Sequence, residues 1–313
     1  DIKIGDYVIV PSGLKEKVYL SHLKLDTKRN IRDSKIIPAQ IKINSEFVRL
    51  LAYYISEGFT NEQGVFLNFG SHETHLIDDS AHCIKKVFNF DPTFNKPHNT
   101  ATRVCMYSQT LTKIFCEIIK AGDNALNKKI PSFIFHIEPK LKKEFIRTLM
   151  KGDGHSRRGY ECCYTTSSKE LKCQLGYLLS LLGISVTYSK KPATKRTFPN
   201  GKEYDVQESY NIYTQARELF GGREKANVSF INLIPIKEIG EIERDKIGWV
   251  NRRCFKTQKY ITKEKLRLLE KYLQSEDIKK LINGNISVLE VKENKRMPTT
   301  SNFVYDLEVP GYN

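Results

Sequence analysis

The feature that most constrains this chain is a pair of apolar segments that each end in an acidic residue followed by glycine. They run from 46 to 58, EFVRLLAYYISEG, and from 144 to 154, EFIRTLMKGDG. The spacing of their apolar residues predicts two helices, and glycine permits a left-handed or open backbone where each helix ends. Glu57 and Asp153 oppose the helix dipole there, so a bound cation explains them better than helix stability does.

Each acid is preceded by two small residues that lie four apart on one helical face. They are Ala52 and Ser56 in the first segment and Thr148 and Gly152 in the second. Two such faces can pack backbone to backbone, which brings the carboxylates together. Paired carboxylates repel unless a metal or a proton lies between them, and Mg²⁺ suits oxygen ligands beside a phosphate substrate. One such site alone would be a capping glycine after a solvated acid, but two in register favour a function.

The patterns that follow the two segments indicate a duplicated α/β unit. After the first come strands at 64–70 and 102–108 around a helix at 74–87, then a helix near 111–119. After the second come a strand at 160–166, a helix at 169–182, strands at 185–191 and 208–214 and a short helix.

The segments LLAYYISEG (50–58) and IRTLMKGDG (146–154) resemble the two motifs of the LAGLIDADG homing endonucleases. The resemblance implies an α+β fold in which two pseudo-symmetric αββαββα units form a DNA-binding saddle. It implies that Mg²⁺ or Mn²⁺ is held at Glu57 and Asp153, with Ser56 and Gly152 beside them. It implies hydrolysis of both strands of a long asymmetric DNA site, leaving 3′ overhangs. The start of the second motif, Ile-Arg-Thr, departs from the family pattern.

Two lysines become catalytic candidates through the same resemblance. NKKIPSFIF (127–135) resembles a block of intein-encoded members and places a family lysine at Lys128. Such a lysine would polarise the scissile phosphate or hold the attacking water, while a surface lysine before a proline is the equal alternative. In FGGREKAN (220–227) the counterpart is Lys225, with Arg223 as its competitor.

The two ends resemble parts of an intein splicing domain. DIKIGDYVIVP (1–11) resembles an N-terminal splicing strand, and FVYDLEVPGYN (303–313) resembles a C-terminal block. The residues that splicing requires at the junctions are absent, so we expect this chain not to splice. The expected divisions are a β-rich intein-like remnant at 1–42, LAGLIDADG halves at 43–135 and 136–227, and a helical accessory subdomain with C-terminal intein-like strands at 228–313, including a helical stretch from Ile261 to Ile282.

Charge favours a polyanionic partner. The chain has 51 Lys and Arg against 36 Asp and Glu, a net charge of +15, which suits double-stranded DNA. The candidate DNA-binding residues are Arg103, Arg157, Arg158, Lys190, Lys191, Lys195, Arg196, Lys202, Arg252 and Arg253. For each of them a solvated surface position is the alternative, and the segment 249–273 equally suits a packed helical subdomain.

Composition narrows the remaining possibilities. No apolar run is long enough to cross a bilayer, no signal-peptide pattern opens the chain, and the seven cysteines form no CxxC pair. We therefore expect an intracellular, cytoplasmic protein, archaeal or otherwise prokaryotic or else organellar, without a membrane partner. Two motifs in one chain predict a monomer that acts as a pseudo-dimer. The alternatives to a nuclease are a DNA- or RNA-binding regulator or maturase of the same fold, and an intein element without nuclease activity.

Overall fold

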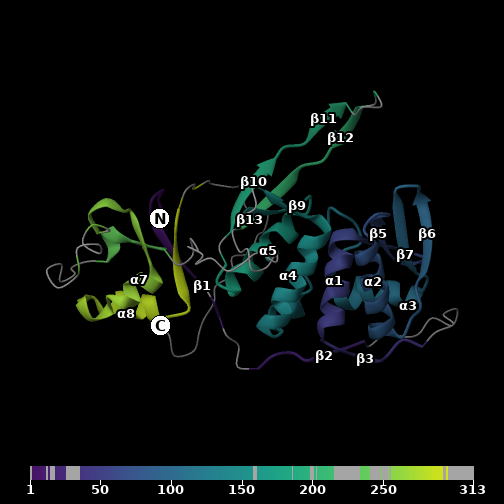
Figure 1. Ribbon diagram of the computed structural model, residues 1–313, viewed down its shortest axis with the longest axis horizontal. Helices are drawn as coiled ribbons and strands as arrows, with labels where there is room; N and C mark the ends of the chain where they lie inside the picture. Colours follow the sequence, from purple (N-terminus) through teal and green to yellow (C-terminus); the bar gives the residue numbers. More distant parts are fainter. Residues whose placement is uncertain are drawn as a thin grey trace, which may run out of the picture.

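The structure is a computed structural model with a mixed helix and strand architecture, so the predicted α+β fold class is confirmed (Figure 1). It describes residues 2–11, 13–14, 18–25, 36–157, 161–184, 186–197, 201, 203–214, 233–239, 248, 253, 255–291 and 294. Within these residues, no helix is long and apolar enough to cross a membrane.

The first unit consists of a motif helix, a helix-covered antiparallel sheet and a closing helix. Its elements are α1 (Ser45–Glu57), β4 (Gly58–Asn61), β5 (Gly64–Gly70), α2 (Thr74–Phe88), β6 (Thr93–His98), β7 (Ala101–Met106), α3 (Gln109–Lys113) and the π-helix η1 (Ile114–Ile119). The strands pair in the order β4-β5-β7-β6. Along β5, Val65, Leu67 and Phe69 alternate into the apolar core while Asn68 faces the other side.

The second unit repeats this order along the chain. Its elements are α4 (Pro139–Asp153), β8 (Gly154–Arg157), β9 (Glu161–Thr166), α5 (Lys169–Leu181), β10 (Thr187–Lys191) and β13 (Ser209–Thr214). The strands pair as β8-β9-β13-β10, which matches the first sheet strand for strand. A second hairpin, β11 (Thr194–Thr197) and β12 (Glu203–Val206), lies between β10 and β13 and extends well beyond the sheet. The short closing helix expected here falls outside the described residues.

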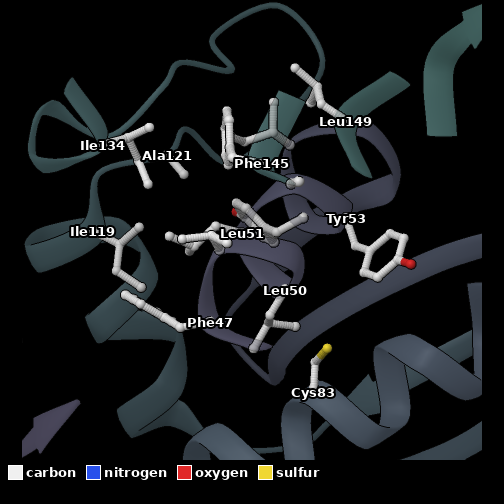
Figure 2. Packing of buried hydrophobic residues seen from close by; sticks show 14 of the residues in the cluster. Phe47, Leu50, Leu51, Tyr53, Cys83, Ile119, Ala121, Ile134, Phe145 and Leu149 are labelled. Carbon is white, nitrogen blue, oxygen red and sulfur yellow. The ribbon is translucent and has the colours of Figure 1, made fainter. Parts of the chain in front are cut away.

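The two motif helices pack against each other at the centre of one apolar core that both units share. Figure 2 shows Leu50 and Leu51 of α1 together with Phe145 and Leu149 of α4, all of them buried. The turn η2 (Ser132–His136) connects the units and contributes Phe133, whose ring stacks on Phe47 of α1. A core built across the two helices fixes their relative position, and therefore the position of their ends.

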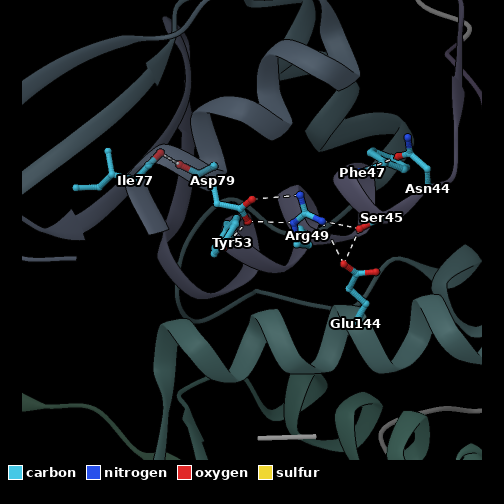
Figure 3. Close-up of polar contacts among 9 residues, drawn as sticks. Asn44, Ser45, Phe47, Arg49, Tyr53, Ile77, Asp79 and Glu144 are labelled. Atoms are coloured by element: carbon cyan, nitrogen blue, oxygen red, sulfur yellow. Dashed lines mark hydrogen bonds and ion pairs between the residues drawn. The ribbon is translucent and has the colours of Figure 1, made fainter. Parts of the chain in front are cut away.

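A polar network also joins the halves, nearer the beginning of the motif helices (Figure 3). Arg49 of α1 donates to both carboxylate oxygens of Asp79 at 3.0 and 3.1 Å, and to Glu144 of α4 at 3.1 Å. Tyr53 donates to the same Asp79 at 2.8 Å. Arg147 follows Glu-Phe-Ile in the second segment as Arg49 follows Glu-Phe-Val in the first. The two arginines are nevertheless not at equivalent helix positions, because Arg49 lies eight residues before Glu57 and Arg147 lies six before Asp153.

The described segments that flank the duplicated units in sequence form smaller structures. Strand β1 (Tyr7–Pro11) pairs antiparallel with β16 (Ile286–Glu290), and β2 (His22–Lys24) pairs with β3 (Gln40–Lys42). A second apolar cluster joins β14 (Leu233–Pro235), the turn η5 (Ile236–Glu238), β15 (Tyr260–Thr262), α7 (Lys263–Leu268), the turn η7 (Glu270–Tyr272) and α8 (Glu276–Asn283). The C-terminal segment 303–313 lies outside the described residues, and the expected domain boundaries stay predictions.

The expectation of one helical stretch from Ile261 to Ile282 is wrong in part. The segment opens in β15 and then forms two α-helices, α7 and α8, with the 3-10 helix η7 between them. The Thr262 side chain accepts a hydrogen bond from the Lys265 amide, and the Ser275 side chain accepts one from the Ile278 amide. Each of these caps begins a new helix, so a single continuous helix is interrupted.

Candidate active site

The two acids lie where the motif helices turn directly into the first strand of each sheet. Glu57 is the last residue of α1 and Asp153 the last of α4. The following glycines have φ of −98° and −88°, so the open backbone is correct and the left-handed alternative is wrong. Glycine is needed for space instead. A Cβ on Gly58 would lie 2.5 Å from the carbonyl oxygen of Tyr54, and one on Gly154 would overlap that of Met150.

The expected close approach of the helices occurs one residue before the acids. A Cβ on Gly152 would overlap the Ser56 hydroxyl oxygen and lie 2.6 Å from the Ser56 Cβ. The same Cβ would lie 2.9 Å from Oε1 of Glu57. One turn earlier on each helix, Ala52 and Thr148 are fully buried. The missing side chain of Gly152 therefore lets the two helix ends meet, and it brings α4 against the first acid.

Both carboxyl groups of the pair have raised pKa values. Burial, followed by the negative charges of Asp153 and Glu73, raises the pKa of Glu57 to about 8. Burial also raises the pKa of Asp153 to about 6, although its side chain has an exposed surface. We attribute the second shift to the protein atoms that crowd one side of an otherwise open carboxylate. A proton or a cation at this position would relieve both shifts.

Tyr164 is a member of this site that the sequence analysis missed. It lies on β9 with 1% of its surface exposed, and its hydroxyl is 3.5 Å from Oδ2 of Asp153. Burial, followed by the charges of Asp153 and Glu57, raises the pKa of Tyr164 well above its ordinary value. The available signal was a tyrosine at a core-facing strand position, where the hydroxyl requires a partner.

The pseudo-symmetric counterpart of Tyr164 carries no hydroxyl. Gly154 pairs with Tyr164 across β8 and β9, and Gly58 pairs with Leu67 across β4 and β5. The second half therefore adds a phenol beside its acid, whereas the first half adds a leucine.

These residues fit a divalent cation. Two carboxylates meet at two helix C-termini, where the last carbonyl oxygens lack intrahelical donors and the helix dipoles favour positive charge. The main-chain carbonyls of Ser56 and Gly152 belong to those last turns. Mg²⁺ is commonly bound by one or two carboxylates, with water and substrate phosphate completing its shell. Consistent with such a sparse set, the described part of the chain holds no group of three or more His, Cys, Asp or Glu arranged for a metal.

Lys128 is buried against the helix that carries Glu57. Its ammonium lies 3.4 Å from the ring centroid of Tyr54, one turn before Glu57, and 3.5 Å from the Gly122 carbonyl oxygen. Burial lowers the pKa of Lys128 to about 7, opposed by the charges of Asp123 and Cys116. Its contacts thus connect it to the helix that carries Glu57 and to neither acid directly. Lys225 and its competitor Arg223 lie outside the described residues.

The candidate DNA-binding residues are spread over both sheets. Arg103 lies on β7, and Lys195 is exposed on the projecting hairpin. Lys191 and Lys190 are adjacent on β10 and so face opposite sides of the sheet. Lys190 is on the helix side and forms an ion pair with Glu208 at 2.6 Å.

The remaining candidates are only partly described. Arg253 is exposed. The backbones of Arg157 and Arg196 belong to β8 and β11, but their side chains are not described. Arg158, Lys202 and Arg252 lie outside the described residues.

Comparison with known proteins identifies a family match in the second half. Residues 140–225 match the family described as LAGLIDADG-like domain. An uncharacterized protein of Methanocaldococcus jannaschii is 29% identical over 197 residues, which are 61% of this chain and 24% of that protein. A DNA polymerase of Thermococcus aggregans is 27% identical over 317 residues, which are 97% of this chain and 16% of the polymerase. The chain thus spans less than a quarter of the length of these relatives.

Among solved structures, the chain is similar to I-DmoI in complex with DNA and Ca, at 13% identity and a TM-score of 0.40. That match covers 56% of this chain and 86% of I-DmoI. Full-length DUF199/WhiA from Thermatoga maritima matches at 12% identity and a TM-score of 0.34, over 62% of this chain and 59% of that one. Neither similarity is close enough to assign a function.

Proposed function

We propose that this protein is a divalent-metal-dependent endonuclease that hydrolyses both strands of a long, asymmetric double-stranded DNA site. The observation that carries the proposal is the meeting of Glu57 and Asp153 at two helix ends that touch through Ser56 and Gly152. The LAGLIDADG-like match, which includes Asp153, supports it, and so does the net charge of +15.

The chemistry follows from the oxygen-rich pair. A divalent ion, Mg²⁺ or Mn²⁺, supplies an activated water and stabilises the leaving oxygen of a phosphodiester. Glu57 and Asp153 would hold it, helped by the carbonyl oxygens of Ser56 and Gly152. Because both carboxyls have raised pKa values, they release protons when the ion binds. Tyr164 would hold the Asp153 carboxylate in one orientation.

Two further features complete the proposal. Lys128 packs on the Tyr54 ring of α1, while direct catalytic roles for Lys128 and Lys225 stay predictions. Each half contributes one acid to a single composite site, so one chain would act as a monomeric pseudo-dimer that leaves 3′ overhangs. Light scattering on the purified chain would check its mass.

The deciding experiment combines selection with cleavage. A random double-stranded library is bound by the wild-type protein without metal, the recovered sequences are cloned, and each clone is incubated with Mg²⁺ or Mn²⁺. Glu57→Gln and Asp153→Asn are compared with Glu62→Gln, a control that removes an exposed acid from the β4–β5 turn. Discrete cleavage that only the first two variants lose, by at least about 100-fold, supports the proposal.

The other outcomes separate the alternatives. Tight sequence-specific binding without cleavage contradicts the nuclease and favours a regulator or maturase. Absence of any specific binding contradicts both readings and leaves the motif helices as a packing interface.

A second candidate is an element inserted in a larger host protein, without nuclease activity. It is favoured by the pairing of β1 with β16 and by the match of nearly the whole chain to a small part of a polymerase. Expressing the chain within its natural flanking sequence and looking for a joined flanking product tests this candidate.

A further inference from the structure

A row of polar side chains crosses the first sheet on the face turned away from the core. Asn68 on β5 pairs with Arg103 on β7, which pairs with Asn95 on β6. Continuing the β4–β5 register one residue beyond the Gly58–Leu67 pair brings Asn68 level with Glu57. Neighbouring strands are about 4.8 Å apart, so the backbone of Arg103, two strands away, lies about 10 Å from the register position of Glu57. The strands concerned run side by side in Figure 1.

Arg103 is held in one position by the side chains around it. Its Nε donates to Oδ1 of Asn68 at 2.7 Å. The guanidinium lies over the rings of Phe59 and Phe66, 5.2 and 5.9 Å from their centroids. These contacts use Nε and the aromatic rings, and no hydrogen bond from either terminal NH₂ group to the described residues accompanies them. A guanidinium fixed in this way loses little freedom when it binds a ligand.

The charge of Arg103 is not neutralised by the described protein. Its contacts are an amide and two aromatic rings, and none of the ion pairs formed by the described residues includes it. Arg49, by contrast, is paired with Asp79 and Glu144. An arginine kept rigid without an acid, in a chain of net charge +15, is suited to an external acceptor.

The available end of the guanidinium could bind phosphate or guanine, and its place on an inner strand of the sheet favours guanine. Two parallel N–H donors fit the O6 and N7 acceptors that guanine presents in the major groove. Strand β7 is an inner strand of its sheet, between β5 and β6. When a sheet lies in the major groove, its inner positions lie over base edges, while its rim meets the phosphates.

In the equivalent row of the second sheet, the polar groups of the central residue are all hydrogen-bonded within the protein. Asn211 on β13 takes the place of Arg103, between Thr165 and Ser189. Its carbonyl oxygen accepts from the Thr165 hydroxyl at 2.9 Å, and its NH₂ group donates to Ser189 and Tyr213 at 3.2 and 3.0 Å. The amide acceptor and both donors are thus engaged within the protein, and Asn211 is buried. Only the first half presents a charged fork at this level.

We infer that Arg103 is a specificity-determining residue that reads one guanine in the half-site bound by the first sheet, next to the cleavage position. The inference rests on the proposed function, because it requires the sheet to lie in the major groove of a DNA target.

The test is selection from random double-stranded DNA without divalent metal. Wild type, Arg103→Ala and Arg103→Lys are compared with Lys86→Ala, which removes a positive charge from α2 on the helix side. We expect the wild-type and Lys86→Ala consensus sequences to share a guanine that becomes unspecified in Arg103→Ala and is selected less strongly in Arg103→Lys, which lacks the planar fork. Changing that guanine to adenine should weaken wild-type binding by about tenfold or more and leave Arg103→Ala binding unchanged. Matching circular dichroism and melting temperatures check that the variants fold.

Each other result has a defined meaning. A uniform loss of affinity in Arg103→Ala with the same consensus identifies a phosphate contact and overturns the inference. An Arg103→Lys protein that keeps a weaker preference for the guanine upholds the inference, because an ammonium can also donate to O6 and N7. A guanine signature in a protein that never cleaves DNA upholds the inference while the nuclease proposal fails. A wild-type protein that selects no sequence overturns both.

Discussion

The two αββαββ units of this chain share their strand order but differ in what they place beside their acids. In the first unit, Arg103 lies on the row of residues level with Glu57 and is held over two aromatic rings. The second unit places the Tyr164 phenol next to Asp153. Its equivalent polar row is Thr165, Asn211 and Ser189, whose side chains bond to one another. Both units thus place a carboxylate at the helix interface, while their sheet faces carry different side chains. Such a molecule is suited to two unlike half-sites joined by one composite centre.

The interface itself is also unequal. Ser56 and Gly152 occupy equivalent positions, yet only one of them can carry a side chain at this separation. The two acids are also unequal, because the pKa is raised to about 8 for Glu57 and to about 6 for Asp153. The following changes test whether these differences are functional, and they run from the largest expected effect to the smallest.

Gly152→Ala tests the contact on which the composite site depends. The added Cβ overlaps Ser56, so we expect a loss of about 1–3 kcal/mol in the free energy of unfolding and a melting temperature lower by about 2–12 °C. Ser56→Gly in the same background moves the glycine to the other half and should restore most of the loss. Thermal unfolding of both single variants and the double variant measures the coupling. Gly152→Ala that melts like wild type would show that the helices are not in contact.

Glu57→Gln and Asp153→Asn test the inequality of the acids in the absence of metal. A carboxyl whose folded pKa exceeds its unfolded value is destabilising once it ionises, so its contribution to stability falls as pH rises from the unfolded to the folded pKa. The window extends from about 4.3 to 8 for Glu57 and from about 3.9 to 6 for Asp153. We therefore expect Glu57→Gln to melt about 2–4 °C above wild type at pH 9 and to match it near pH 4. Asp153→Asn should gain its smaller advantage already by pH 7.

The pH series has its own control and its own contrary result. Glu62→Gln, with an exposed carboxyl, should follow the wild-type curve at every pH. Parallel curves for all four proteins would mean that the pair of acids is as well hydrated as a surface carboxylate.

Tyr164→Phe removes the hydroxyl that only the second half possesses. That hydroxyl lowers the pKa of Asp153, so its loss should move the rising limb of the cleavage rate to higher pH. Because the bond is long, 3.5 Å, we expect a decrease of about 2–10-fold near neutral pH. Tyr177→Phe, which removes an exposed hydroxyl from α5, serves as the matched control. An unchanged pH profile would limit Tyr164 to a packing role.

Lys191→Ala and Lys190→Ala compare two neighbours on opposite faces of β10. Lys191 is on the side turned away from the helices, whereas Lys190 is paired with Glu208. If the outer faces bind DNA, Lys191→Ala should reduce the slope of log affinity against log salt concentration by about 1. Lys190→Ala should leave that slope unchanged. Binding titrations over a range of salt concentrations measure both, and equal slopes for the two variants would argue against an outer-face contact.

Local sequence patterns predicted the helices and strands whose apolar residues recur with a clear helical or alternating spacing. The helices α1, α2 and α5 and the strands β5, β7, β9 and β13 lie within one or two residues of the expected ranges. The short strands β4 and β8 were missed, because each begins at the glycine of an acid-glycine pair and has only four residues in which to show alternation. The accessory helix was misjudged because helical spacing continues through the caps at Thr262 and Ser275.

The sequence by itself determined that this chain carries two amphipathic helices ending in an acid, each followed by a strand-rich unit, because helix periodicity and the acid-glycine ends are local. It also determined the basic surplus. Only the tertiary structure decided that Ser56 meets Gly152, that Tyr164 reaches Asp153, that Lys128 lies on the Tyr54 ring and that Asn211 occupies the position of Arg103. These contacts join residues that are far apart along the chain, and their geometry depends on how the two helices and two sheets pack in the shared core.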